Sequence, residues 1–77
     1  MEYAMLIEKE KTGGYTATFP DLPGCVTQGE TMGELIYMAE DAIETYLSGL
    51  KELGEPIPKP KYRAAMVEAR PPKKKVG

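Results

Sequence analysis

The chain has 77 residues, a net charge of −2, one cysteine and no histidine. A chain this short holds one domain at most, and it buries only roughly 60% of the surface that its unfolded form exposes. The single cysteine excludes an internal disulfide, and the lack of histidine removes the commonest general base and metal ligand. No stretch approaches the roughly 20 apolar residues of a membrane span. The N-terminal residues, MEYAMLIEKE, have neither the basic start nor the long apolar stretch of a secretory signal. We therefore expect a cytoplasmic protein with a thin core, no cofactor and no bound metal.

Charge is divided unevenly along the chain. Residues 1–58 carry three lysines and eleven acids, a net charge of −8, whereas residues 59–77 carry seven basic residues and one acid, a net charge of +6. An acidic body and a basic tail are different surfaces with different potential partners.

Three short segments in the first 29 residues have the character of strands. Residues 3–9 place Tyr3, Met5 and Ile7 on one face and Ala4, Leu6 and Glu8 on the other, and a first face that is apolar throughout is typical of a strand. The glycine pair at 13–14 predicts a hairpin turn, and residues 15–19 are rich in β-branched and aromatic side chains. A shaped loop with two prolines occupies residues 20–24, and residues 25–29 follow as a third strand. These segments predict an antiparallel meander.

One long helix is predicted from Met32 to Leu53. Thr31 and Glu34 have the spacing of a capping box, and Gly54 stands where a helix commonly ends. At 100° per residue one side of this helix is apolar. The apolar side comprises Met32, Leu35, Ile36, Ala39, Ala42, Ile43, Tyr46, Leu47, Leu50 and Leu53.

The region after the helix is harder to assign. Alternate prolines make residues 55–60 an extended spacer. Residues 61–69 alternate in the manner of an edge strand, although a helical turn would also suit their alanines. We predict an α+β fold of order β-β-β-α-β: a small antiparallel three-stranded sheet, a long amphipathic helix and a short fourth strand. Residues 1–70 would form this single domain, and residues 71–77 a basic flexible tail.

No catalytic set emerges from the side chains. A magnesium-dependent nuclease needs several converging carboxylates, and Asp21 with the helix acids is the nearest approach to one. Cys25 has no histidine to activate it, so we interpret it as a buried filler. The lysines at 73–75 could touch phosphate or simply solubilise the chain. On the helix, Glu40, Asp41 and Glu44 belong to a single-signed face that suits a basic partner or plain solvent.

Residues 19–25 read FPDLPGC, and Thr27, Gly29, Thr31 and Glu34 follow at fixed spacing. This combination resembles the signature of the HicB antitoxin family, and the resemblance extends over about residues 3–60. It implies a partial RNase H-like fold in which residues 61–69 supply the last strand. It also implies a role in a type II toxin–antitoxin system, in which the antitoxin binds and neutralises a small basic HicA-type toxin that cleaves mRNA.

The resemblance and the charge pattern together predict a partner-binding site rather than a catalytic one. Its residues would be Asp21, Leu22, Pro23, Gly24, Glu40, Asp41 and Glu44, with a HicA-like toxin and further copies of the chain as partners. Many members of the family carry a C-terminal DNA-binding domain, for which the residues after position 60 are too few, so we expect none here. Two alternatives stay open: an orphan, self-associating domain without a toxin, and a minimal magnesium-dependent nuclease.

Overall fold

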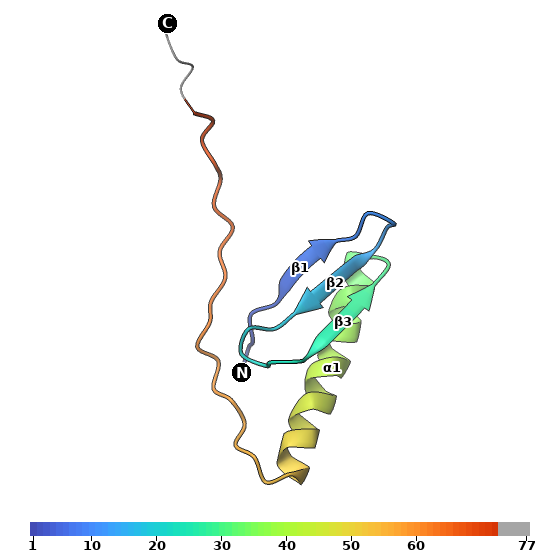
Figure 1. The fold of residues 1–77 in the computed structure, drawn as a ribbon, viewed down its shortest axis with the longest axis vertical. Coiled ribbons are helices and arrows are strands. Elements are labelled where there is room, and N and C mark those ends of the chain that lie inside the picture. Colours follow the sequence, from blue (N-terminus) through green and yellow to red (C-terminus); the bar gives the residue numbers. More distant parts are fainter. Residues whose placement is uncertain (73–77) are drawn as a thin grey trace, which may run out of the picture.

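A computed structural model of the chain describes residues 1–72 and consists of one sheet and one helix (Figure 1). The strands are β1 (Leu6–Lys9), β2 (Tyr15–Thr18) and β3 (Val26–Gly29), and the helix is α1 (Met32–Glu52). The strands are hydrogen-bonded in the order β1-β2-β3, and both pairs are antiparallel. The predicted α+β class, the three-stranded meander and the long helix are therefore confirmed.

Two glycines make the turn between β1 and β2 possible. Gly13 and Gly14 have φ angles of 100° and 81°, which residues with a side chain rarely adopt. The amide of Glu10 donates to the carbonyl of Gly14 at 3.0 Å and closes the turn. The pairing that follows sets Ile7 opposite Ala17, and Ala17 opposite Thr27, on one face of the sheet.

The helix begins and ends where its capping residues predict. The Thr31 hydroxyl accepts the Glu34 amide at 3.1 Å, which satisfies one of the free donors of the first turn. At the other end the amide of Gly54 donates to the carbonyl of Lys51, and the amide of Glu55 donates to that of Leu50. This pair of bonds is a Schellman motif around a left-handed glycine.

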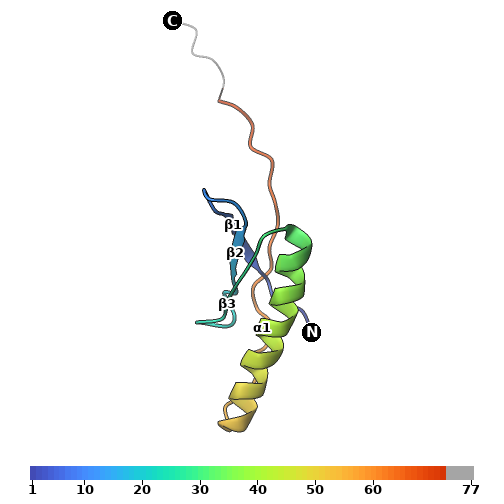
Figure 2. The ribbon, with the colours of Figure 1, turned by 90° about the vertical axis from the view of Figure 1, so that its right-hand side faces the viewer.

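The helix covers only part of the sheet. Figure 2 shows α1 lying on one face of the sheet, and its backbone approaches that of β3 and β2 but not that of β1. The core lies in this contact and under the loop after β2; its buried apolar members are Ala17, Phe19, Leu22, Cys25, Leu35 and Ala39. Met32, Ile36 and Leu53, which were predicted on the apolar side of the helix, are exposed. Within residues 1–72 no helix is long and apolar enough to span a bilayer.

The predicted fourth strand is absent from residues 61–69, and this part of the prediction is wrong for the isolated chain. These residues are exposed and form neither strand nor helix. Strand geometry needs a neighbouring edge to receive its backbone bonds, and here the amides of Lys61 and Tyr62 donate to a side chain instead. The likeness to RNase H stays a prediction, and the lysines at 73–75, with most of the predicted tail, lie outside the described residues.

Candidate partner-binding surface

The loop between β2 and β3 is a pair of tight turns built around a buried leucine. The amide of Leu22 donates to the carbonyl of Phe19, and the amide of Cys25 donates to the carbonyl of Leu22, both at 3.0 Å. Gly24 completes the second turn with a φ of 84°. The Leu22 side chain is 0% exposed and packs with Phe19, Cys25 and Ala39. The loop therefore contributes one of its own side chains to the core.

Asp21 faces into the molecule and binds the chain after the helix. Asp21 is 7% exposed, and its Oδ2 atom accepts hydrogen bonds from the amides of Lys61 and Tyr62 at 3.2 and 3.1 Å. Beside it, the Tyr3 hydroxyl donates to the carbonyl of Pro58 at 2.6 Å. We call these three bonds the latch, because they tie the C-terminal segment to the loop and to the N-terminal residues.

Removing the Asp21 carboxylate should release the latch. We expect Asp21→Ala to accelerate amide hydrogen exchange at Lys61 and Tyr62 by at least about tenfold, since hydrogen bonds to a charged group contribute about 1.5–3 kcal/mol each. Exchange measured residue by residue by NMR tests this, with Asp41→Ala on the exposed helix face as the control. Unchanged exchange at both amides in Asp21→Ala would show that the carboxylate does not hold them.

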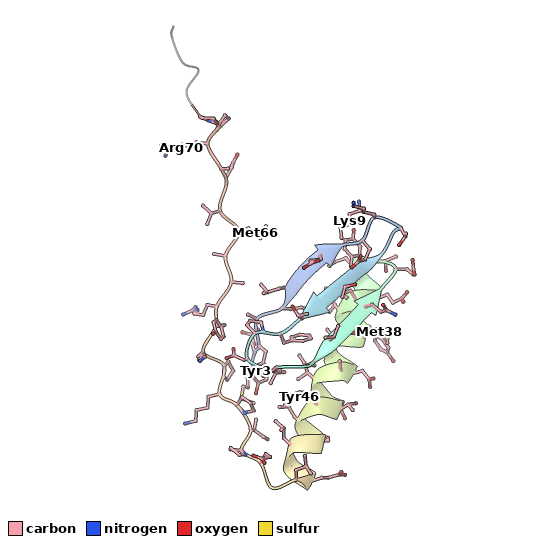
Figure 3. The ribbon with its side chains drawn as sticks, in the orientation of Figure 1. Tyr3, Lys9, Met38, Tyr46, Met66 and Arg70 are labelled. Carbon is pink, nitrogen blue, oxygen red and sulfur yellow. The ribbon has the colours of Figure 1, made fainter. Side chains whose placement is uncertain are left out.

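The exposed part of the loop adjoins the acidic face of the helix. Pro23 and Gly24 are exposed, and the Tyr46 hydroxyl of α1 donates to the Pro23 carbonyl at 2.9 Å, which fixes the loop against the helix (Figure 3). A shallow depression joins the two elements. It is lined by Gly24, Cys25, Val26, Asp41, Ala42, Thr45 and Tyr46.

Asp41 links this depression to a second one along the helix. The second hollow is lined by Asp41, Glu44, Thr45, Ser48, Gly49 and Glu52. Glu40, one helical turn before Glu44, is exposed. The two hollows thus run from Gly24 at the loop tip past Asp41 to Glu44. We call these three residues, with the neighbouring exposed Pro23 and Glu40, the acidic surface.

The seven predicted site residues thus separate into two groups. Pro23, Gly24 and the three helix acids are available to a partner, whereas Asp21 and Leu22 are occupied by contacts within the chain.

Sequence reasoning missed Val26 and Tyr46. Val26 is 57% exposed at the rim of the depression, and its position next to the loop was the only signal for it. Tyr46 was assigned to the apolar side of the helix, and its hydroxyl gave no sign of a bond to the loop.

Cys25 lies under this surface. The residue is 6% exposed, and burial raises the pKa of its thiol. A raised pKa keeps the sulfur protonated, which agrees with its interpretation as a filler. Among residues 1–72 no three acids or cysteines come together in a way that would hold a metal ion.

The geometry defines a small α+β domain with an exposed loop tip and an exposed acidic helix face. The model of the HicB-like antitoxin of bacterial toxin–antitoxin systems matches residues 3–74. The chain therefore belongs to the HicB-like antitoxin family, as its loop signature predicted.

Individual relatives agree with this assignment. The UPF0150 protein Ta0767 of Thermoplasma acidophilum is 38% identical over 69 residues, which are 90% of this chain and 100% of that protein. Antitoxin HicB of Escherichia coli K12 is 38% identical over 60 residues, 78% of this chain and 44% of the relative. The chain thus spans less than half the length of that named antitoxin, and it resembles a short relative end to end.

A solved structure has the same fold. A chain of the HicA3 and HicB3 toxin–antitoxin complex superimposes with a TM-score of 0.65 and 30% sequence identity, covering 78% of this chain and 70% of that one. Family membership favours a binding protein over an enzyme.

Proposed function

We propose that this chain is the antitoxin of a type II toxin–antitoxin pair, and that it binds and neutralises a HicA-type toxin in the cytoplasm. Membership of the HicB-like family supports this proposal. The observation that carries the mechanism is the continuity of the loop tip with the helix acids through Asp41. A toxin that cleaves mRNA must bind phosphate, and a basic RNA-binding surface would be attracted to this face.

The acidic surface would act by covering the RNA-binding face of the toxin. Glu40, Asp41 and Glu44 would pair with lysine or arginine side chains of the toxin. Pro23 and Gly24 would contact it as a preformed loop, whose shape Leu22 and Asp21 maintain from within the domain. Because the loop is already held in place, little ordering entropy is lost on binding. We further propose that the domain associates with itself, since a core of six buried apolar side chains is small.

Charge reversal tests the proposed surface. We expect the triple variant Glu40→Lys, Asp41→Lys, Glu44→Lys to weaken toxin binding by about 10- to 100-fold or more, chiefly through slower association at low salt, because three attractions become repulsions. The variant Glu2→Lys, Glu30→Lys, Glu55→Lys makes the same change in net charge at exposed acids elsewhere and should bind nearly as well as the unaltered chain.

The measurement is calorimetry with the small protein encoded beside this chain in its genome, combined with an assay of RNA cleavage by that protein. Tight binding of the unaltered chain with loss of RNA cleavage is the expected result. Equal affinities for both triple variants would reject the acidic surface while leaving the antitoxin role intact. No binding by the unaltered chain would reject the antitoxin role and leave an orphan self-associating domain.

A further inference from the structure

Residues 63–72, which follow the latch, are all exposed in the single chain. We call residues 61–72 the arm; it begins at the latch and extends alone along the β1 side of the molecule (Figure 1). Met66 and Val67 are 101% and 86% exposed, and Figure 3 shows Met66 and Arg70 standing well away from the sheet. An extended segment with alternating residues and exposed apolar side chains has the properties of an unpaired strand.

The sheet offers an edge that is equally unpaired. β1 is an outer strand, so half of its backbone donors and acceptors point away from β2. Leu6 and Ile7 are both exposed, one on each face of the sheet. Ile7 shares the face of the buried Ala17, yet it stays exposed, and the backbone of α1 does not approach that of β1. Among the described residues, β1 therefore has no neighbouring strand on its outer side, and its apolar side chains are only partly covered.

The chain's own arm leaves this edge free. An opening separates the two segments, with Glu2, Tyr3 and Ala4 on one side and Pro60, Tyr62, Arg63 and Ala64 on the other. The latch fixes the start of the arm at Asp21, beside the residues that precede β1. From there the arm diverges, and none of its backbone amides beyond Tyr62 bonds to another described residue.

We propose that the arm of a second copy of this chain pairs with the free edge of β1 and supplies there the fourth strand that the single chain lacks. Charge is compatible with this occupant: the arm carries three basic residues and one acid, a net charge of +2, while residues 2–11 carry three acids and two lysines, a net charge of −1. Length is sufficient, because the eight residues after the latch to Arg70 extend over roughly 26 Å and the four residues of β1 need about 13 Å. This inference specifies the self-association proposed above and is independent of toxin binding.

Such pairing would place the exposed apolar side chains of the arm next to the exposed apolar side chains of β1. In an added strand, Met66 and Val67 lie on opposite faces of the sheet. One of them would then stand beside Leu6 and the other beside Ile7, and both exposed β1 residues would gain an apolar neighbour. The latch would serve to present the arm at a defined distance from its own domain.

Two neighbouring alanines make a matched test. Ala64 and Ala65 have the same side chain, but consecutive strand residues direct their amides to opposite sides. Proline lacks the amide and is tolerated in a strand only where that amide would face away from the ladder. We therefore expect one of Ala64→Pro and Ala65→Pro to raise the dissociation constant for self-association on the order of tenfold or more, and the other to leave it nearly unchanged. Both substitutions lie outside the domain's own strands and helix, so the folded chain should persist.

The measurement is sedimentation equilibrium of the unaltered chain and both variants, with circular dichroism to verify the fold. A self-associating chain that is weakened by one proline and not by the other supports exchange of the arm. A chain that is monomeric at micromolar concentration overturns the proposal, as does an oligomer that both prolines affect equally or that neither affects. Calorimetry with the toxin separates this outcome from the antitoxin role, since neither substitution touches the acidic surface.

Discussion

Replacement of Gly29 by alanine is expected to lower the free energy of unfolding by about 3 kcal/mol or more. A Cβ atom at this position would lie 2.5 Å from the amide nitrogen of Leu35 and 2.8 Å from its Cα. Both are backbone atoms of α1 and cannot rotate away, so the helix would have to lift from β3. Overpacking of a core commonly costs about 1–3 kcal/mol, and a clash with backbone belongs at the upper end. A domain of this size rarely has more than about 3–5 kcal/mol to lose.

The matched control for Gly29→Ala is Gly49→Ala. Gly49 lies inside α1, and a Cβ there would meet nothing within 4 Å, so the same substitution should stabilise the helix by up to about 1 kcal/mol. Urea unfolding followed by circular dichroism measures both changes. Similar midpoints for the two variants would mean that helix and strand do not approach as closely as described.

Gly29 also explains why the signature of this family is recognisable in a single sequence. The alternation of β3 directs Thr27 and Gly29 toward the helix, and both are buried. Thr31 then caps the helix that begins at Met32, so only two residues separate the strand from the first turn. The spacing of Thr27, Gly29 and Thr31 therefore follows from the close return of the helix over the strand. This part of the fold was predictable from the sequence.

The loop signature was informative about structure and misleading about exposure. Its residues suggested a partner-binding loop, and nothing in the sequence distinguishes a loop residue that faces solvent from one that faces the core. Leu22 turned out to be a core residue, and Asp21 receives two amides from residues about 40 positions away. Contacts over such a separation depend on where the proline spacer directs the chain, and residue patterns do not encode that direction.

The fourth strand could not be judged from its own sequence for a related reason. Alternation of apolar and polar residues predicts that a segment suits a sheet, but a strand exists only where an edge receives it. Residues 61–69 have the pattern, and the edge of their own sheet is left open at β1. The arm exchange proposed above would bring this pattern to the edge of a second copy of the chain.

Truncation of Leu22 separates a structural role of the loop from a direct role in binding. We expect Leu22→Ala to lower the free energy of unfolding by about 2–5 kcal/mol, because a fully buried leucine loses its contacts and leaves a cavity. For a domain of this size the melting temperature should fall by more than about 10 °C. Leu53→Ala, which truncates a leucine that is 77% exposed, should change stability by less than about 0.5 kcal/mol.

Toxin affinity measured on Leu22→Ala well below its melting temperature decides between the two roles. If Leu22 acts from within the core, the fraction of the variant that is folded should bind the toxin with an affinity close to that of the unaltered chain. If Leu22 itself contacts the toxin, affinity should fall sharply while thermal stability changes little. The second outcome would mean that the loop opens on binding and turns its leucine outward. The two turns around Leu22 would then be a closed state of the loop, and the acidic surface would be only part of the interface.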